Sequence, residues 1–163
     1  MPDLLFETPE FVFSYRVAGI CIHNGKILLQ KPTNDTGFSF PGGHVSYGET
    51  HEQTLVREFH EEIGAEISVG PLQWVGEIFF PWGKKPCQQI CLYYLISITD
   101  SHTPRQGMFL AQEHLQGRDF ELEFHWVPME NLQQIKVYPE GAAAYLKNMH
   151  SGVQHFVLQR KRH

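Results

Sequence analysis

The chain has 163 residues, of which 42% are hydrophobic, 13% aromatic and 19% charged. This composition excludes a mainly disordered or collagen-like chain, and the length fits one domain. The formal net charge of −5 provides no overall attraction toward a polyanion, so duplex nucleic acid is not an expected partner. We expect a single domain over 1–163, with its core at about 12–150 and a C-terminal tail over 151–163.

The sequence shows no sign of a membrane or secretory protein. No stretch approaches the ~20 apolar residues of a membrane span, so we expect no membrane partner. The first ten residues lack the basic segment and apolar run of a secretory signal. The three cysteines are an odd number, which does not suggest a disulfide framework. These features predict a reducing, cytoplasmic location.

The first predicted elements are strands. Residues 11–23 are rich in Val, Ile, Phe and Tyr, and a second β-rich run covers 26–30. Between them lies Asn24-Gly25, a pair typical of a tight hairpin turn. Residues 38–40 resemble a short strand that stops at 41–43, a Pro-Gly-Gly sequence.

The segment 50–63 is predicted to be a helix. Thr50 and Gln53 fit the capping box, in which each side chain satisfies an end amide of the helix. Gly64 stands where a C-terminal cap belongs. Apolar residues at helical spacing, Leu55 among them, predict one buried stripe.

The second half of the chain is again rich in β-type sequence. A second hairpin is expected, with a turn at Pro81-Trp82-Gly83, and residues 101–117 are ambiguous. Residues 155–159 are either a last strand or part of the tail. The predicted strands are 66–80, 87–98 and 119–127, and the predicted helices are 128–135 and 139–149.

Three glutamates crowd one side of the last two turns of the predicted helix. Glu58, Glu61 and Glu62 are three and four residues apart, so their like charges repel. They also lie near the helix C-terminus, where each negative charge costs about 0.3–1 kcal/mol. A solvated helix face is the simple explanation, and a hard divalent cation with oxygen ligands, Mg²⁺ or Mn²⁺, is the functional one.

The residues before the helix favour the functional explanation. Glycines at 42, 43 and 48 allow the loop to approach a ligand closely. Glu49 precedes the helix within reach of Arg57, so an ion pair between them could hold the loop against the helix.

This segment resembles the Nudix box, the motif of the Nudix hydrolase family. The pattern is Gly, five residues, Glu, seven residues, Arg-Glu, an aliphatic residue, any residue, Glu-Glu, any residue, Gly and an aliphatic residue. Phe59 and Ala65 are mild departures at the two aliphatic positions. The fixed positions are occupied by Gly43, Glu49, Arg57, Glu58, Glu61, Glu62 and Gly64.

The resemblance implies a mixed α/β (α+β) fold, an α/β/α sandwich around a mixed sheet, and a catalytic activity. The implied reaction is hydrolysis of the diphosphate linkage in a nucleoside diphosphate derivative, with Mg²⁺ or Mn²⁺ as cofactor. By the same resemblance Glu58, Glu61 and Glu62 bind the metal, with the Gly43 carbonyl as a further ligand. Arg57 and Glu49 hold the loop and helix in the catalytic geometry.

The catalytic base is left open by the resemblance. Some family members use a glutamate of the box, and others use a glutamate from a later loop. The candidates for the later role are Glu113, Glu121 and Glu123.

The sequence gives less information about the residues that bind the substrate. Trp82, in a turn beside two lysines, could stack a nucleobase, whereas Phe80 and Tyr93 fit core packing equally well. Arg16 could reach a phosphate or base, although a strand arginine is more often simply exposed. Pro81 lies where relatives that hydrolyse ADP-ribose tend to carry a proline, and turns use proline anyway.

Several functions stay open at this point. The expected partner is a small nucleotide-type substrate: a nucleoside triphosphate, ADP-ribose or a nucleotide sugar. A catalytically silent Nudix module that senses a nucleotide is the alternative, although such modules usually lack a box glutamate. Hydrolysis of an RNA 5′ end would favour a basic channel, which the net charge does not suggest. The oligomeric state is also open, with a homodimer as one option.

Overall fold

Strand β2 (Val12–His23) is the centre of the sheet in the computed structural model, which describes residues 2–115 and 117–160. It pairs in parallel with β7 (Lys85–Ile98). Its antiparallel partners are β1 (Leu5–Glu7), β3 (Lys26–Pro32) and β5 (Gly42–His44). Most side chains of β2 are buried, because both faces of this strand are covered.

The first predicted hairpin is confirmed. Asn24 and Gly25 have φ values of 51° and 74°, the left-handed pair that a two-residue turn requires. The second hairpin joins β6 (Ile67–Trp82) to β7, but its turn differs from the prediction. Strand pairing continues through Pro81 and Trp82, so the turn consists of Gly83, where φ is 60°, and Lys84.

The remaining strands extend the sheet on both sides. Its order is β10-β4-β3-β2-β7-β6-β11, and β9 pairs with both β3 and β8. The ambiguous stretch before residue 118 contains β8, which forms a hairpin with β9. The bounds are β4 (Phe38–Ser39), β8 (Met108–Leu115), β9 (Arg118–Pro128), β10 (Val137–Tyr138) and β11 (Gln154–Gln159).

Helix α1 (His51–Ile63) matches the prediction closely. The Thr50 hydroxyl accepts from the Gln53 amide at 3.2 Å, and the Gln53 side chain accepts from the Thr50 amide at 2.9 Å. Gly64 ends the helix in the left-handed conformation. Both ends are therefore determined by local sequence, and Leu55 faces the core.

The C-terminal part contains less helix than predicted. The segment after β9 is a 3₁₀ helix, η1 (Met129–Gln134), and only Ala142–Lys147 form α2, followed by η2 (Met149–Ser151). Residues 154–159 are a strand, because β11 pairs in parallel with β6. Phe156 is only 7% exposed, so the core extends beyond the expected boundary at residue 150. Residues 161–163 of the expected tail lie outside the described part.

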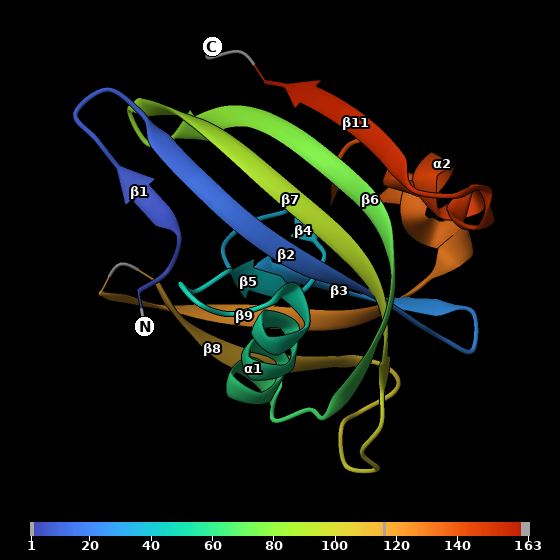
Figure 1. Cartoon of the computed structure of the whole chain (residues 1–163). Helices are drawn as coiled ribbons and strands as arrows, with labels where there is room; N and C mark the ends of the chain where they lie inside the picture. The colour runs from blue at the N-terminus through green and yellow to red at the C-terminus, as the bar shows by residue number, and fades with distance from the viewer. Residues whose placement is uncertain (1, 116, 161–163) are drawn as a thin grey trace.

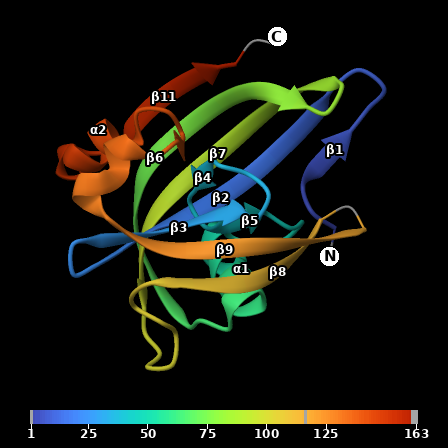
Figure 2. The ribbon, with the colours of Figure 1, turned by 180° about the vertical axis from the view of Figure 1, so that it is seen from behind.

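Two hydrophobic cores lie on opposite faces of the sheet, and alternate residues of β2 contribute to each. Val17 faces the core that contains Phe59 of α1, and Ala18 faces the core that contains Leu146 of α2. The two helices accordingly lie on different sides of the molecule (Figures 1 and 2). The predicted α+β class, a mixed sheet between helices, is confirmed.

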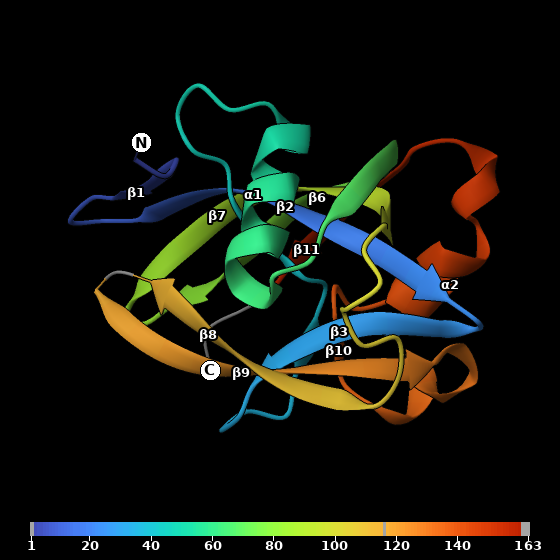
Figure 3. The same ribbon diagram turned by 90° about the horizontal axis from the view of Figure 1, so that it is seen from below.

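The hairpin β8–β9 curls around so that it approaches α1. Figure 3 shows β3, β8 and β9 in a layer below β2 and β7, with α1 beside β8. This curl brings residues of β8 opposite the box glutamates. Among the described residues, no helix is long and apolar enough to cross a membrane.

Candidate active site

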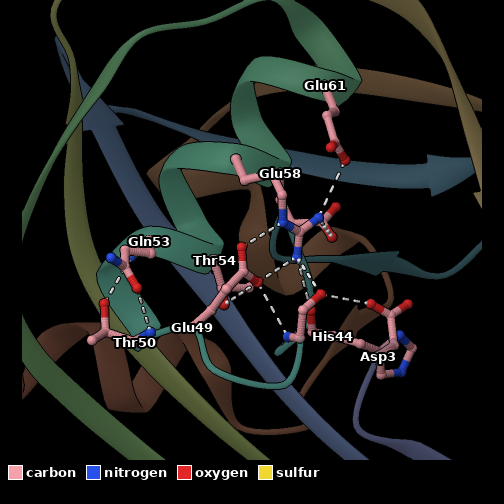
Figure 4. Close-up of polar contacts among 10 residues, drawn as sticks. Asp3, His44, Glu49, Thr50, Gln53, Thr54, Glu58 and Glu61 are labelled. Atoms are coloured by element: carbon pink, nitrogen blue, oxygen red, sulfur yellow. Dashed lines mark hydrogen bonds and ion pairs between the residues drawn. The ribbon is translucent and has the colours of Figure 1, made fainter. Parts of the chain in front are cut away.

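Arg57 connects the loop before α1 with the helix itself. Its Nε and Nη2 donate to the two carboxylate oxygens of Glu49 at 2.8 and 2.9 Å (Figure 4). Nη2 also lies 3.2 Å from the Ser46 hydroxyl. Nη1 donates to Glu58 at 2.8 Å and to Glu61 at 3.2 Å. One guanidinium therefore contacts three carboxylates.

Glu49 is a charged carboxylate whose two oxygens both accept hydrogen bonds. Its Oε1 accepts from the Thr54 hydroxyl at 3.1 Å and from the Ser46 amide at 3.2 Å. Hydrogen bonds from Arg57 lower the pKa of this carboxyl to about 2. Both oxygens of Glu49 thus bind groups of the loop and the helix.

The three box glutamates differ in their surroundings. The Glu61 side chain is 58% exposed and that of Glu58 is 14% exposed. Glu62 has a carboxylate oxygen, Oε1, that is enclosed and has no hydrogen-bond partner. Burial, followed by the charges of Glu113 and Glu58, raises the pKa of Glu62 well above its usual range. Burial also raises the pKa of Glu58, against the opposing effect of Arg57.

Gly43 lies directly against the Glu58 carboxylate. A Cβ at position 43 would be 2.2 Å from the carboxyl carbon of Glu58, a distance that real structures do not allow. Because Gly43 has no side chain, its backbone can lie in direct contact with the Glu58 carboxylate.

The donor set fits a hard divalent cation. The pocket has a volume of about 430 Å³ and is lined by Gly43, Glu58, Glu61, Glu62 and Glu113, among others. An enclosed carboxylate oxygen without a partner is costly unless a proton or a cation satisfies it. Within the described residues no three acidic, His or Cys side chains already have the geometry of a metal site, and Arg57 holds two of the carboxylates.

Glu113 is the one later candidate that lies in this pocket. It comes from β8 and faces Glu62, and burial raises its pKa. In the β8–β9 hairpin Glu113 pairs with Phe120, which places Glu121 on the opposite face. Glu123 also lies on that opposite face, where it contacts Lys31 at 3.1 Å.

A second pocket of about 350 Å³ adjoins the first, and His44 and Glu113 line both. Arg16 and Trp82, the predicted substrate-binding residues, both line this second pocket. The Arg16 guanidinium donates to the Phe40 carbonyl at 3.0 Å. Arg16 therefore forms part of the pocket wall and is not an exposed strand residue.

Sequence reasoning missed two features of the site. Asp3 lines the first pocket and accepts from the Ser46 hydroxyl at 3.0 Å, because the N-terminal segment pairs with the loop. The buried Ser14 donates to Gln89 at 2.9 Å and lies 3.0 Å from Nε2 of His44. No local motif marks these contacts. For Glu113, the alternation Phe109, Ala111, Glu113 is the signal that could have placed it at the end of an apolar face.

Comparison with known proteins agrees with this fold. The NUDIX domain profile matches residues 14–149. The chain therefore belongs to the Nudix family. The solved MutT protein of Bacillus halodurans has a similar fold, with a TM-score of 0.60 at 15% identity over 90% of each chain. A UDP-X diphosphatase has a TM-score of 0.56 at 16% identity, covering 94% of this chain and 68% of the other.

Curated relatives match over shorter stretches. The RNA pyrophosphohydrolase of Pseudoalteromonas translucida is 42% identical over 61 residues, which is 34% of this chain and 36% of the relative. The CTP pyrophosphohydrolase of Escherichia coli is 47% identical over 58 residues, 33% of this chain and 43% of the relative. The chain thus matches less than half the length of these relatives.

Proposed function

We propose that this protein is a divalent-metal-dependent pyrophosphohydrolase that acts on a small nucleoside diphosphate derivative. The observation that carries the proposal is the enclosed oxygen of Glu62, which has no partner and faces two further carboxylates. Such an arrangement is unfavourable in the empty protein and becomes favourable when a cation is bound. Membership of the Nudix family supports the same reaction class.

Glu58, Glu61, Glu62 and the Gly43 carbonyl would hold Mg²⁺ or Mn²⁺. A cation held by these residues would neutralise charge on the diphosphate and lower the pKa of a water molecule. Arg57 has to release Glu58 and Glu61 for this purpose. Its Nη1 makes those two contacts, whereas Nε and Nη2 hold Glu49, so the release does not require the loop to separate from the helix.

Glu113 is the proposed general base. It lies in the same pocket as the box glutamates but on a different element, so it can face a water molecule from the side opposite α1. Burial raises its pKa, which brings it closer to neutral pH and improves its ability to take a proton.

The second pocket is the proposed place for the nucleoside. Its volume of about 350 Å³ suits one nucleotide rather than a longer chain. Trp82 offers an aromatic face to a base, and Arg16 offers a guanidinium to a phosphate or base. We therefore favour a free nucleotide over an RNA 5′ end, although the curated relatives include enzymes named for each substrate.

The test is a hydrolysis screen with Mg²⁺ and with Mn²⁺, in which products are identified by chromatography. Substrates are nucleoside triphosphates, ADP-ribose, nucleotide sugars and 5′-triphosphorylated RNA. We expect metal-dependent cleavage of a small nucleotide by the natural protein and none by Glu62→Gln. Binding of nucleotides without any turnover would instead support the silent sensing module. A cytoplasmic location stays a prediction, to be checked by fractionation, and light scattering would determine the oligomeric state, which is open.

A further inference from the structure

Gln30 is a buried amide with an unused hydrogen-bond acceptor. It lies on β3, opposite Phe124 of β9, and its side chain is only 6% exposed. Its Oε1 is enclosed and has no hydrogen-bond partner. Buried polar side chains are nearly always paired, so an unpaired one calls for an explanation.

The position of Gln30 supplies that explanation. Its side chain lines the second pocket together with Arg16 and Trp82. Two other acceptors of this pocket are already used. The Phe40 carbonyl accepts from Arg16, and the Gln89 oxygen accepts from Ser14. Of the enclosed side-chain atoms without a partner among the described residues, only Gln30 Oε1 belongs to a residue that lines this pocket, so a ligand there could satisfy it.

The chemistry of the pocket indicates which group would satisfy it. Aromatic residues, Phe80 and Tyr93 as well as Trp82, line the same space and suit a planar ring. The edge of a nucleobase carries N–H donors. An exocyclic amino group projects beyond the ring and reaches an acceptor in the wall. The ring N–H of uracil lies between two carbonyl oxygens, which the same acceptor would repel.

We propose that Gln30 is a specificity-determining residue, which accepts a hydrogen bond from the exocyclic amino group of the substrate base. The protein would then prefer nucleotides of cytosine, adenine or guanine to those of uracil. This inference rests on the proposed function, because it assumes that the base of the substrate occupies the second pocket. It adds the chemical class of the base to that proposal.

The test measures binding of nucleoside monophosphates by calorimetry, which requires no turnover. The natural protein is titrated with CMP, AMP, GMP and UMP, and with ribose 5-phosphate as a ligand without a base. We expect at least one amino-bearing nucleotide to bind about tenfold or more tightly than UMP, the size of one buried hydrogen bond. In Gln30→Leu this preference should disappear, because the amino-bearing nucleotides bind more weakly and UMP is no longer repelled, while binding of ribose 5-phosphate stays unchanged.

Gln73→Leu is the matched control. Gln73 is equally buried, at 7% exposure, but it lies on β6 outside the pocket and donates to the Pro71 carbonyl at 3.2 Å. This variant should keep the base preference. Its melting temperature should fall more than that of Gln30→Leu, because only Gln73 loses a hydrogen bond. A larger fall for Gln30→Leu would show a structural role and overturn the inference.

The remaining outcomes separate this inference from the proposed function. Hydrolysis of small nucleotides with equal binding of CMP, AMP, GMP and UMP would overturn the role of Gln30 and leave the enzyme proposal standing. A base preference that Gln30→Leu abolishes, without hydrolysis of any substrate, would support Gln30 and overturn the enzyme proposal. Absence of nucleotide binding altogether would overturn the role of Gln30.

Discussion

Arg57 donates two parallel hydrogen bonds to the Glu49 carboxylate, at 2.8 and 2.9 Å, and these bonds hold the loop before α1 against the helix. The fork of a guanidinium matches both oxygens of a carboxylate, and a lysine ammonium cannot do so. The same guanidinium extends to two of the box carboxylates. A single side chain thus sets the distance between loop and glutamates.

Arg57→Lys should therefore lose both stability and activity. We expect the free energy of unfolding to fall by about 1–3 kcal/mol, because one charged hydrogen bond of the pair is lost. Denaturant unfolding measures the first effect, and turnover by the folded fraction measures the second. Unchanged turnover per folded molecule would show that the loop position is not set by Arg57.

The acid stability of the protein should depend on Glu49. Hydrogen bonds from Arg57 lower its pKa from 4.5 to about 2, so the folded state favours the charged carboxylate. The resulting stabilisation is complete above pH 4.5 and is lost as the pH falls toward 2. Stability measured over this range should fall less steeply for Glu49→Gln than for the natural protein. Glu121→Gln, an exposed control, should keep the natural slope.

Glu62→Gln should abolish turnover but stabilise the metal-free protein. Burial and neighbouring carboxylates raise the pKa of Glu62, so its charged form destabilises the fold above the ordinary pKa of a glutamate. We expect a gain of about 1–2 kcal/mol at pH 8 that disappears below pH 4.5. Thermal unfolding with a chelator measures this gain. A loss of stability at pH 8 would contradict the view that the charged Glu62 carboxylate destabilises the protein when no cation is bound.

Divalent cations should stabilise the natural protein. At a concentration of Mn²⁺ about 100 times its Kd, we expect the melting temperature to rise by about 5 °C or more, because the cation binds only the folded state. The rise should be absent in Glu62→Gln. An equal rise in both proteins would place the cation elsewhere.

Adjacent glycines should respond differently to substitution by alanine. In Gly43→Ala the new Cβ meets the Glu58 carboxylate, a side chain that can move, so activity and the response to cations should be lost with little loss of stability. In Gly42→Ala the Cβ would lie 2.0 Å from the Val17 carbonyl oxygen, which is fixed in the sheet. We expect this variant to lose about 3 kcal/mol. Equal instability of both variants would remove the argument that position 43 makes room for a ligand group.

The role of Glu113 can be tested with a pair of variants on one hairpin. Glu113→Gln should lower kcat by about 10²–10⁴, the usual contribution of a general base. Glu121→Gln makes the same chemical change on the opposite face and should leave kcat unchanged. A small effect of Glu113→Gln would return the role of base to a glutamate of the box.

The amino-acid sequence by itself determined the parts of this protein that depend on neighbouring residues. The capping box of Thr50 and Gln53, the cap at Gly64 and the turn at Asn24-Gly25 are local, so α1 and the first hairpin could be predicted. The spacing of the box glutamates along α1 is local as well. Their crowding on one helix face therefore needed no structure.

Only the tertiary structure decided what faces those glutamates. Glu113 enters the site because β8 pairs with β9 and this hairpin curls toward α1, and its selection over Glu121 depends on strand register. Gln30 is a pocket residue for the same reason, since its burial comes from strands distant in sequence. Residues 154–159 form strand β11 through their parallel pairing with β6, a segment more than 70 residues earlier in the chain. Contacts of this kind join residues far apart in the chain, and no local pattern encodes them.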